Sequence, residues 1–494
     1  MIGTVMAEPI RSTLAGPKIN ARALADLLGH WPAGDGALYR LLALRIARLA
    51  DTGELSPGLR LPAERELAVA LSVSRNTVAA AYQLLRDEGL AESRQGAGTT
   101  IGPHRTTPGA VHRANGFFAG LLQETTVTTD LTLAGVAPAP QVAAALIEPM
   151  SVVGRSELAA VLTGSGHFPY GYPALREAVA SHLTTRLGLP TGAGQIMITT
   201  GAQQALDLLI RAEVLPGQPI GAEDPTFPGV LDALQRSGAR VVGIPSDDGL
   251  DPDRVAHALR THQPALIYMI PTHHNPTGLV MPASQRERIA ALAARYQETV
   301  FVDDMTLAEL QLRDAPLPPP VAAFSPLPNL VTIGSLSKVY WGGLRIGWIR
   351  ADPGMVSRLA AAKAAADLGS PAFQQAIVAA LLNDRHDEVL KWRNDWLRRR
   401  YDAVSAALAA RLPGWSWPVP EGGLTLWIRL PGQADGGRFA QTALRHGVPV
   451  VPGRLLSAGR RADADEHIRL AFIQAPEALT EAVSGLARAW AAFG

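Results

Sequence analysis

The pattern of apolar and polar positions divides the chain into two parts. Within residues 36–102, helical spacing recurs in three stretches, and short alternating segments follow them. From about residue 131, short apolar runs alternate with helical stretches, for example at 196–199, 219–222, 265–270 and 300–302. This alternation predicts a mostly parallel α/β sheet in the second part.

The first part has the pattern of a helix-turn-helix followed by a β-hairpin. We expect helices at 38–52, 64–71 and 75–87. The tight turn at 72–74 joins the last two, Ser74 is placed to cap the third helix, and Gly89 suits its end. Residues 90–101 predict two strands around a glycine-containing turn, which is the wing of a winged helix.

These patterns predict four segments in a multidomain chain. Residues 1–35 form an N-terminal extension without an assignable element, and residues 103–130 lose periodicity as a linker does. An α+β winged helix-turn-helix at 36–102 therefore precedes an α/β domain at 131–494.

Composition excludes several classes of function. The chain has no cysteine, so disulfides, zinc–thiolate sites and cysteine nucleophiles are ruled out. It is 47% hydrophobic and 18% charged, which allows large cores, and no uncharged apolar run is long enough to cross a membrane. We expect a cytoplasmic protein with no membrane partner.

Groove-reading residue types gather at the start of the third predicted helix. Ser74, Arg75, Asn76 and Thr77 lie where a recognition helix enters the major groove of DNA. Further DNA contacts are expected from the second helix and the wing, at Arg65, Arg94 and Gly96. Residues 36–102 hold eight arginines against seven acids, so charge alone is a weak signal, and a protein-interaction module is the alternative.

The motifs of this part are more specific than its charge. The module resembles the GntR winged helix over its whole length, which implies double-stranded DNA as the partner. The matching segments are 38–40, Gly58-Leu59-Arg60-Leu61-Pro62-Ala63-Glu64-Arg65-Glu66-Leu67-Ala68, Val73-Ser74-Arg75-Asn76-Thr77-Val78 and 89–99.

Lys338 is the residue of the second part that most clearly indicates chemistry. Only four of the 45 basic residues are lysine, and arginine cannot lose a proton to attack a carbonyl. Lys338 follows the strand-like run 330–333, has serines before it and has Arg345 after it. An amine, hydroxyls and a guanidinium are what a Schiff base with pyridoxal 5'-phosphate (PLP) needs.

Candidates for the other PLP contacts occur in a plausible order. The phosphate would bind the turn at 199–204, where Gly201, Ala202 and Gln203 begin a helix, together with Ser335 and Arg345. Phe227 would stack on the ring, Asn275 would donate to its hydroxyl, and Asp303 would hold the ring nitrogen protonated. Asp304 could take the place of Asp303, and each residue alone has an ordinary structural alternative as turn, cap or core.

This second part resembles the fold-type I aminotransferases over most of residues 131–494, which implies a smaller C-terminal α/β subdomain. The motifs that carry the resemblance are 200–205, Glu223-Asp224-Pro225, Asn275-Pro276-Thr277-Gly278, Ser335-Leu336-Ser337-Lys338 and Gly343-Leu344-Arg345-Ile346-Gly347. The resemblance implies that Tyr170 reaches the phosphate of a neighbouring subunit and that Arg469 grips a substrate carboxylate. A surface arginine on an edge strand is the alternative for Arg469.

One position departs from that family. A tyrosine usually follows the ring-nitrogen aspartate by two or three residues, whereas Met305 and Thr306 stand here. Methionine cannot donate a hydrogen bond, and threonine does not titrate in the useful range. Efficient transamination is therefore in doubt.

The two parts together resemble the MocR-type transcriptional regulators. The first hypothesis is a PLP-dependent regulator in which PLP or an amino compound on Lys338 changes DNA affinity, so that the chain is not primarily an enzyme. The alternative is an active aminotransferase with an accessory DNA-binding domain, and both imply a homodimer. A weaker reading makes the second part only a dimerisation scaffold, against which Lys338 argues.

Overall fold

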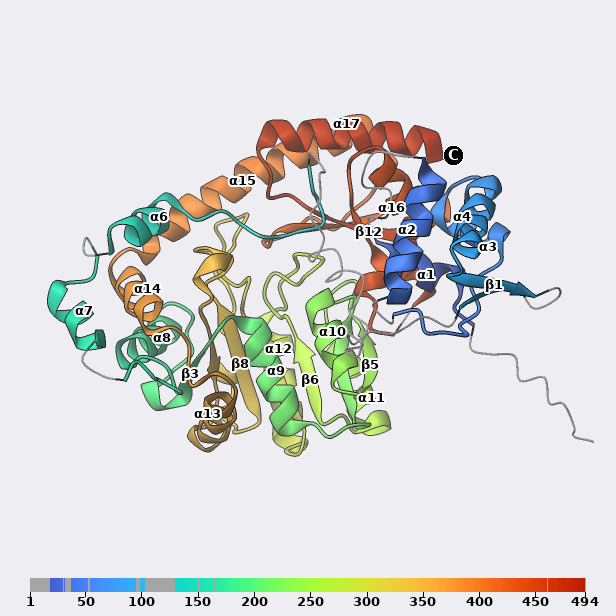
Figure 1. Cartoon of the computed structure of the whole chain (residues 1–494). Coiled ribbons are helices and arrows are strands. Elements are labelled where there is room, and N and C mark those ends of the chain that lie inside the picture. The colour runs from blue at the N-terminus through green and yellow to red at the C-terminus, as the bar shows by residue number, and fades with distance from the viewer. Residues whose placement is uncertain are drawn as a thin grey trace, which may run out of the picture. The chain divides into compact units, whose positions relative to one another are not determined.

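The chain forms two compact units, Met1–Thr126 and Val127–Gly494, in the computed structural model (Figure 1). The structure describes residues 18–29, 31, 37–51, 54–94, 98–102, 129–149, 152–162, 165–459 and 461–493. No helix within these ranges is both long and apolar enough to span a bilayer.

The described part of the first unit contains helices followed by a hairpin. The helices are α1 (Ala21–Leu28), α2 (Leu38–Asp51), α3 (Glu64–Leu71) and α4 (Arg75–Asp87). Strands β1 (Ala91–Arg94) and β2 (Gly98–Ile101) pair antiparallel, with Ala91 opposite Ile101. The predicted helix-turn-helix and wing are confirmed.

Local chemistry explains where the recognition helix begins and ends. The backbone N–H of Thr77 donates a hydrogen bond of 3.1 Å to Ser74 Oγ, which caps α4. After the helix, Gly89 has a φ of 71°, a left-handed conformation that glycine adopts without strain. The expected cap and stop are therefore both present.

Helix α1 lies in the segment to which the sequence assigned no element. The Asn20 side chain caps it by accepting a hydrogen bond of 2.8 Å from the N–H of Ala23. Leu24 and Leu28 are fully buried and share one hydrophobic core with α2, α3 and α4. The extension thus contributes to the core of the first unit.

A seven-stranded sheet forms the centre of the second unit, in the order β3-β9-β8-β7-β6-β4-β5. Strand β9 runs antiparallel to both of its neighbours, and the other pairs are parallel, so the sheet is mostly parallel as predicted. The strands are β3 (Ile196–Thr199), β4 (Pro219–Asp224), β5 (Arg240–Pro245), β6 (Leu266–Met269), β7 (Val300–Asp304), β8 (Leu330–Ser335) and β9 (Gly347–Arg350).

Helices cover both faces of this sheet. Phe301 and Val302, neighbours on β7, belong to the two different hydrophobic clusters on its faces. The helices before and around the sheet are α6 (Pro140–Ile147), α7 (Arg155–Leu162), α8 (Pro173–Thr185), α9 (Ala202–Glu213), α10 (Pro228–Arg236), α11 (Pro252–His262), α12 (Ala283–Arg295), α13 (Pro353–Asp367) and α14 (Ala372–Asp384). Burial on both faces explains why the strands are continuous apolar runs.

The C-terminal part of the second unit is a smaller α/β subdomain. Its antiparallel sheet has the order β10-β12-β11, formed by β10 (Thr425–Arg429), β11 (Val451–Pro452) and β12 (His467–Ala471). Its helices are α15 (His386–Arg411), α16 (Gly436–Arg445) and α17 (Pro476–Phe493), and α15 packs along α17 (Figure 1). Short 3-10 helices lie at Ala193–Gln195, Val321–Ala323, Gly342–Leu344, Pro431–Gln433, Gly453–Leu456 and Ala462–Glu466.

Candidate cofactor site and nucleic-acid interface

Lys338 lies in the loop that follows β8, and its side chain points towards Ala134, near the start of the second unit. Its Nζ donates a hydrogen bond of 2.7 Å to the backbone carbonyl of Ala134. Burial, with the positive charges of Arg469 and Arg345, lowers the pKa of Lys338 to about 8. A fraction of this amine is therefore neutral near pH 7, as attack on an aldehyde requires.

The predicted phosphate-binding residues come together between β3, β8 and β9. The Arg345 guanidinium donates a hydrogen bond to the Thr200 carbonyl, and a Cβ on Gly201 would lie 3.2 Å from that guanidinium. Gly201 has a φ of 105°, so a side chain there would be strained as well as crowded. Because α9 begins at Ala202, its first N–H groups lack partners within the helix and face this turn.

Ser335, the last residue of β8, lies at the same edge. Its hydroxyl contacts Ser337 Oγ at 2.8 Å and donates to the Ile346 carbonyl at 3.1 Å. Gln203 makes a different contact, donating a hydrogen bond of 2.9 Å to the Gly229 carbonyl at the start of α10. Its side chain thus links two helix starts, while its backbone N–H belongs to the first turn of α9.

The two aspartates of β7 have different surroundings. Asp304 accepts hydrogen bonds from the Tyr268 hydroxyl at 2.6 Å and the Thr306 N–H at 2.8 Å, which occupy both of its oxygens. Asp303 accepts one bond of 2.9 Å from the Val321 N–H, and within the described residues its buried Oδ1 has no partner. Burial raises the pKa of Asp303 to about 6. Strand β7 extends to Asp304, so Asp303 lies inside the strand and not after it.

Phe227 and Asn275 lie after β4 and β6. These strands and β7 are consecutive in the sheet, so their carboxyl ends bring Phe227, Asn275 and Asp303 to one edge. The Phe227 ring packs so closely on Gly229 that a Cβ there would lie 2.3 Å from it. The Asn275-Pro276 peptide is cis, and Asn275 Oδ1 is buried without a hydrogen-bond partner in the described structure.

Arg469 is buried in β12, the central strand of the small sheet. Its guanidinium donates a hydrogen bond to the Thr132 carbonyl, and burial lowers its pKa to about 10. The alternative of a surface arginine on an edge strand is therefore wrong. Tyr170, by contrast, is 40% exposed, and the Arg176 guanidinium lies 5.5 Å from the centre of its ring.

A buried lysine that the sequence did not reveal supports the turn before α9. Lys363 on α13 has no exposed surface and donates hydrogen bonds to Asp367 at 2.6 Å and to Gln204 at 3.1 Å. Gln204 accepts in turn from the Thr200 N–H at 2.8 Å. The spacing of Lys363 and Asp367, one helical turn apart, was the available signal.

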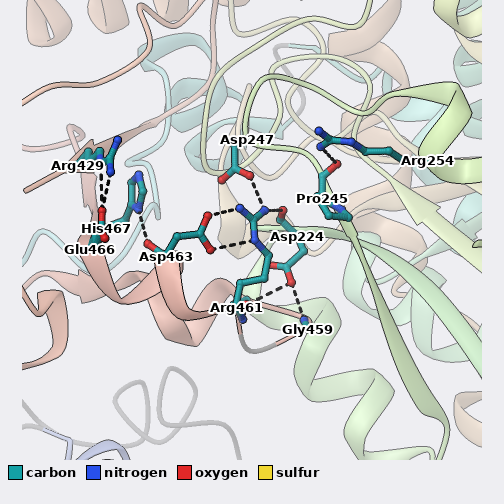
Figure 2. Close-up of polar contacts among 11 residues, drawn as sticks. Asp224, Pro245, Asp247, Arg254, Arg429, Gly459, Arg461, Asp463, Glu466 and His467 are labelled. Carbon is teal, nitrogen blue, oxygen red and sulfur yellow. Dashed lines mark hydrogen bonds and ion pairs between the residues drawn. The ribbon is translucent and has the colours of Figure 1, made fainter. Parts of the chain in front are cut away.

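A charged network holds the segment before Phe227 against the C-terminal subdomain (Figure 2). Asp224 accepts hydrogen bonds from the Gly459 N–H at 2.6 Å and from Ser457 Oγ at 3.2 Å. Arg461 donates to the Asp224 carbonyl at 3.1 Å and pairs with Asp247 and Asp463. The network thus joins the ends of β4 and β5 to Ser457, Gly459 and Arg461.

The predicted DNA-reading residues lie at the start of α4 in the first unit. Ser74, Arg75 and Asn76 are exposed, and Thr77 is half-buried. The Arg75 side chain is 64% exposed and contacts Glu64 at 3.1 Å. Arg94 lies on β1, and Gly96 lies outside the described residues.

Two of the predicted DNA-binding residues, Arg65 and Arg75, line a groove of about 670 Å³ that the sequence did not predict. Five cationic side chains line it against one acidic side chain, Glu64; the five are Lys18, Arg60, Arg65, Arg75 and Arg86. The weak net charge of the module therefore hides a local concentration of positive charge. Such a concentration is suited to the phosphates of DNA.

Comparison with known families agrees with both units. Residues 132–486 match the family "Aminotransferase class I and II", and residues 38–101 match "Bacterial regulatory proteins, gntR family". Among solved structures, the alpha-aminoadipate aminotransferase LysN from Thermus thermophilus is similar, with a TM-score of 0.63 and 28% identity. The match covers 76% of this chain and 96% of that one.

Similar curated proteins include regulators and enzymes. The HTH-type transcriptional regulator YisV of Bacillus subtilis is 30% identical over 85% of this chain and 89% of its own length. The pyridoxine biosynthesis transcriptional regulator PdxR of Corynebacterium glutamicum is 30% identical over 76% of this chain and 80% of its own. An aromatic-amino-acid aminotransferase of Thermococcus litoralis is 33% identical over 62% of this chain and 75% of its own. The chain therefore belongs to the MocR type of regulator, in which a gntR-family winged helix precedes an aminotransferase class I and II domain.

Proposed function

We propose that the protein is a DNA-binding transcriptional regulator whose second unit binds PLP at Lys338 and senses PLP itself or a small amino compound. The observation that carries the proposal is the pairing of two features in one chain. An exposed recognition-helix start borders a cationic groove, and a lysine of lowered pKa lies near Arg345, whose guanidinium contacts the turn before α9. A DNA-binding surface does not require a PLP site, and a PLP site does not require a DNA-binding surface.

The residues of the second unit fit PLP in several respects. Within the described residues, Asp303 Oδ1 on β7 and Asn275 Oδ1 in the loop after the neighbouring strand β6 are buried without partners. A side chain at Gly201 would be strained and would crowd Arg345. When bound, PLP supplies an aldehyde that takes up amines and a ring that withdraws electrons from them. In our proposal Asp303 holds the proton on the ring nitrogen, Phe227 stacks on the ring, and Asn275 donates to the ring hydroxyl. Gly201, Ala202, Gln203, Ser335 and Arg345 would hold the phosphate.

Arg469 and Tyr170 extend the proposal to the effector and to a second copy of the chain. A buried guanidinium whose charge acts on Lys338 is suited to hold the carboxylate of an amino compound near that amine. Tyr170 is exposed, as we expect of a side chain that reaches the phosphate site of a second copy of the chain. We therefore propose a homodimer. Size-exclusion chromatography with light scattering tests the oligomeric state directly.

Aminotransferase activity is the second candidate, favoured by the intact pair Lys338 and Arg469. The residues after Asp303 argue against efficient turnover, because Met305 is a buried thioether without a donor. Tyr268, the nearby phenol, already donates to Asp304 at 2.6 Å. We therefore propose that any transamination is residual.

Absorbance spectroscopy separates these functions. Full-length protein loaded with PLP should show a visible band of the bound cofactor, and Lys338→Ala should lose it. A panel of amino acids is then added, and the band is followed in time. Rapid conversion would favour the enzyme, whereas a slow or absent conversion supports the regulator; absence of the band from the wild type would contradict both.

A further inference from the structure

Three buried side chains outside the proposed cofactor site meet in the second unit. His182 comes from α8, Glu309 from the segment after β7, and His386 from the first residue of α15. Glu309 Oε1 lies 2.8 Å from His386 Nε2, and Glu309 Oε2 lies 3.3 Å from His182 Nε2. One nitrogen or oxygen atom from each residue can be chosen so that all three lie within 4.8 Å of one another.

The charge of this cluster requires a cation. In the described residues, the two histidines are the only ion-pair partners of the Glu309 carboxylate. If both imidazoles are neutral, Glu309 leaves an uncompensated negative charge in the interior, which is costly. Either a proton on an imidazole or a bound metal ion must balance it. A proton on His182 Nε2 would face Glu309 Oε2 at 3.3 Å, a longer contact than the 2.8 Å between His386 Nε2 and Glu309 Oε1.

We propose that His182, Glu309 and His386 form a binding site for a divalent transition-metal ion of the Zn²⁺ class. Two imidazoles and one carboxylate are a ligand set that Zn²⁺ takes up in proteins. Two ligand atoms about 2.0–2.1 Å from one tetrahedral zinc ion lie about 3.3 Å apart. The separations of 2.8 and 3.3 Å from the two imidazoles to the Glu309 oxygens are close to that value. The ligand atoms lie within 4.8 Å of one another, so the two imidazoles would have to move towards each other to bind one ion.

Contacts around the cluster orient its ligands. The Tyr340 hydroxyl lies 3.1 Å from His386 Nδ1, so an Nδ1–H can donate to it and leave the Nε2 lone pair facing the cluster. Asn394 donates a hydrogen bond of 3.2 Å to the Glu309 carbonyl and fixes that segment. The Glu309 side chain is 11% exposed, which leaves a route for an ion and for water as the remaining ligand.

The position of the site suggests a structural role. Tyr340 is two residues from Lys338, and Glu309 follows the strand that carries Asp303. An ion bound here would fasten the segment after β7 to α8 and α15, and the contact between Tyr340 and His386 would connect the Lys338 loop to it. The inference does not depend on PLP or on DNA binding.

Zinc titration of untagged, full-length protein tests this proposal. After chelator treatment, isothermal titration calorimetry with Zn²⁺ should show one saturable ion per chain. His182→Gln and His386→Gln should each weaken binding by at least 10-fold, and Tyr340→Phe should weaken it about 10-fold by freeing the His386 ring. His257→Gln, on the exposed surface of α11, is the matched control and should bind as the wild type does.

Two further readouts guard against misfolded variants. Far-UV circular dichroism must show native helix content in each variant. Zn²⁺ should raise the unfolding temperature of the wild type and of His257→Gln, but not that of His386→Gln. No saturable zinc binding by the wild type, or equal binding by all variants, would overturn the proposal and leave a protonated histidine as the balancing charge.

Discussion

The amine of Lys338 donates a hydrogen bond of 2.7 Å to the backbone carbonyl of Ala134. The side chain is half-buried, and the positive charges of Arg469 and Arg345 act on the amine. Burial contributes most to the lowered pKa of about 8, and the two arginines add to it. The lysine is thus prepared to lose its proton well below the pH at which an exposed lysine would.

The first prediction concerns the pH dependence of cofactor attachment. The neutral fraction of an amine of pKa about 8 rises from roughly one tenth at pH 7 to roughly nine tenths at pH 9. The rate at which PLP attaches to the apo-protein should therefore rise about 10-fold over this range and then level off. Arg469→Met should shift the midpoint to higher pH. A rate that keeps rising about 10-fold per pH unit up to pH 10 would contradict the lowered pKa.

Asp303 and Asp304 provide a matched pair of variants. Asp303→Asn should weaken PLP binding about 10- to 100-fold, because it removes a charged acceptor worth about 1.5–3 kcal/mol. Asp304→Asn should have a smaller effect, because both oxygens of Asp304 are already bonded within the protein. Because the pKa of Asp303 is about 6, affinity should also fall as the pH drops from 7 to 5. Equilibrium dialysis checks the ranking, and the reverse order would assign the ring nitrogen to Asp304.

Arg75 and Glu64 lead to opposite expectations for DNA binding. Arg75→Ala should weaken binding to the promoter upstream of the gene and, if Arg75 contacts a phosphate, lower the salt slope by about one. Glu64→Gln should tighten binding, because it removes the carboxylate 3.1 Å from Arg75 and the negative charge lining the groove. Arg240→Ala, exposed on β5 of the other unit, serves as control. Fluorescence anisotropy at several salt concentrations measures all three, and equal affinities would refute this recognition surface.

Arg461 and Arg429 test the network of Figure 2. Arg461→Ala should lower the free energy of unfolding by about 1 kcal/mol, because the half-buried Asp247 and the more exposed Asp463 both lose their partner. Arg429 pairs with Glu466 at 2.8 Å, but its side chain is 59% exposed, so Arg429→Ala should change that free energy by less than about 0.5 kcal/mol. Urea denaturation compares them, and equal losses would mean that the network is only a surface feature.

Much of the fold could be predicted from the sequence, because it depends on signals that are local in the chain. Burial of both sheet faces produced continuous apolar strands, and Ser74 and Gly89 marked the ends of the recognition helix. The sequence did not show that β7 includes Asp303. A polar residue in the last positions of a buried strand has the same sequence pattern as a polar residue that follows the strand. Helix α1 was missed because its short amphipathic pattern lies in a mixed segment.

The candidate site was predictable where residues adjacent in sequence share a task, as in the Ser335 to Lys338 run. Partners distant in sequence were not predictable. Three such partners are the Ala134 carbonyl, the buried Lys363 that supports the turn before α9, and the histidines on either side of Glu309, and they can be identified only in the folded chain. Such contacts follow no periodic pattern in the sequence, because they form only when separate elements pack against one another.

The coupling of the two units is the central claim, and operator affinity with and without PLP tests it most directly. Fluorescence anisotropy would compare the wild type and Lys338→Ala on the promoter fragment upstream of the gene. PLP should change the affinity of the wild type by about fivefold or more, as expected for an allosteric coupling of at least 1 kcal/mol, and leave that of Lys338→Ala unchanged. Wild-type affinity that is the same in both conditions, in protein shown by absorbance to hold PLP, would contradict the account.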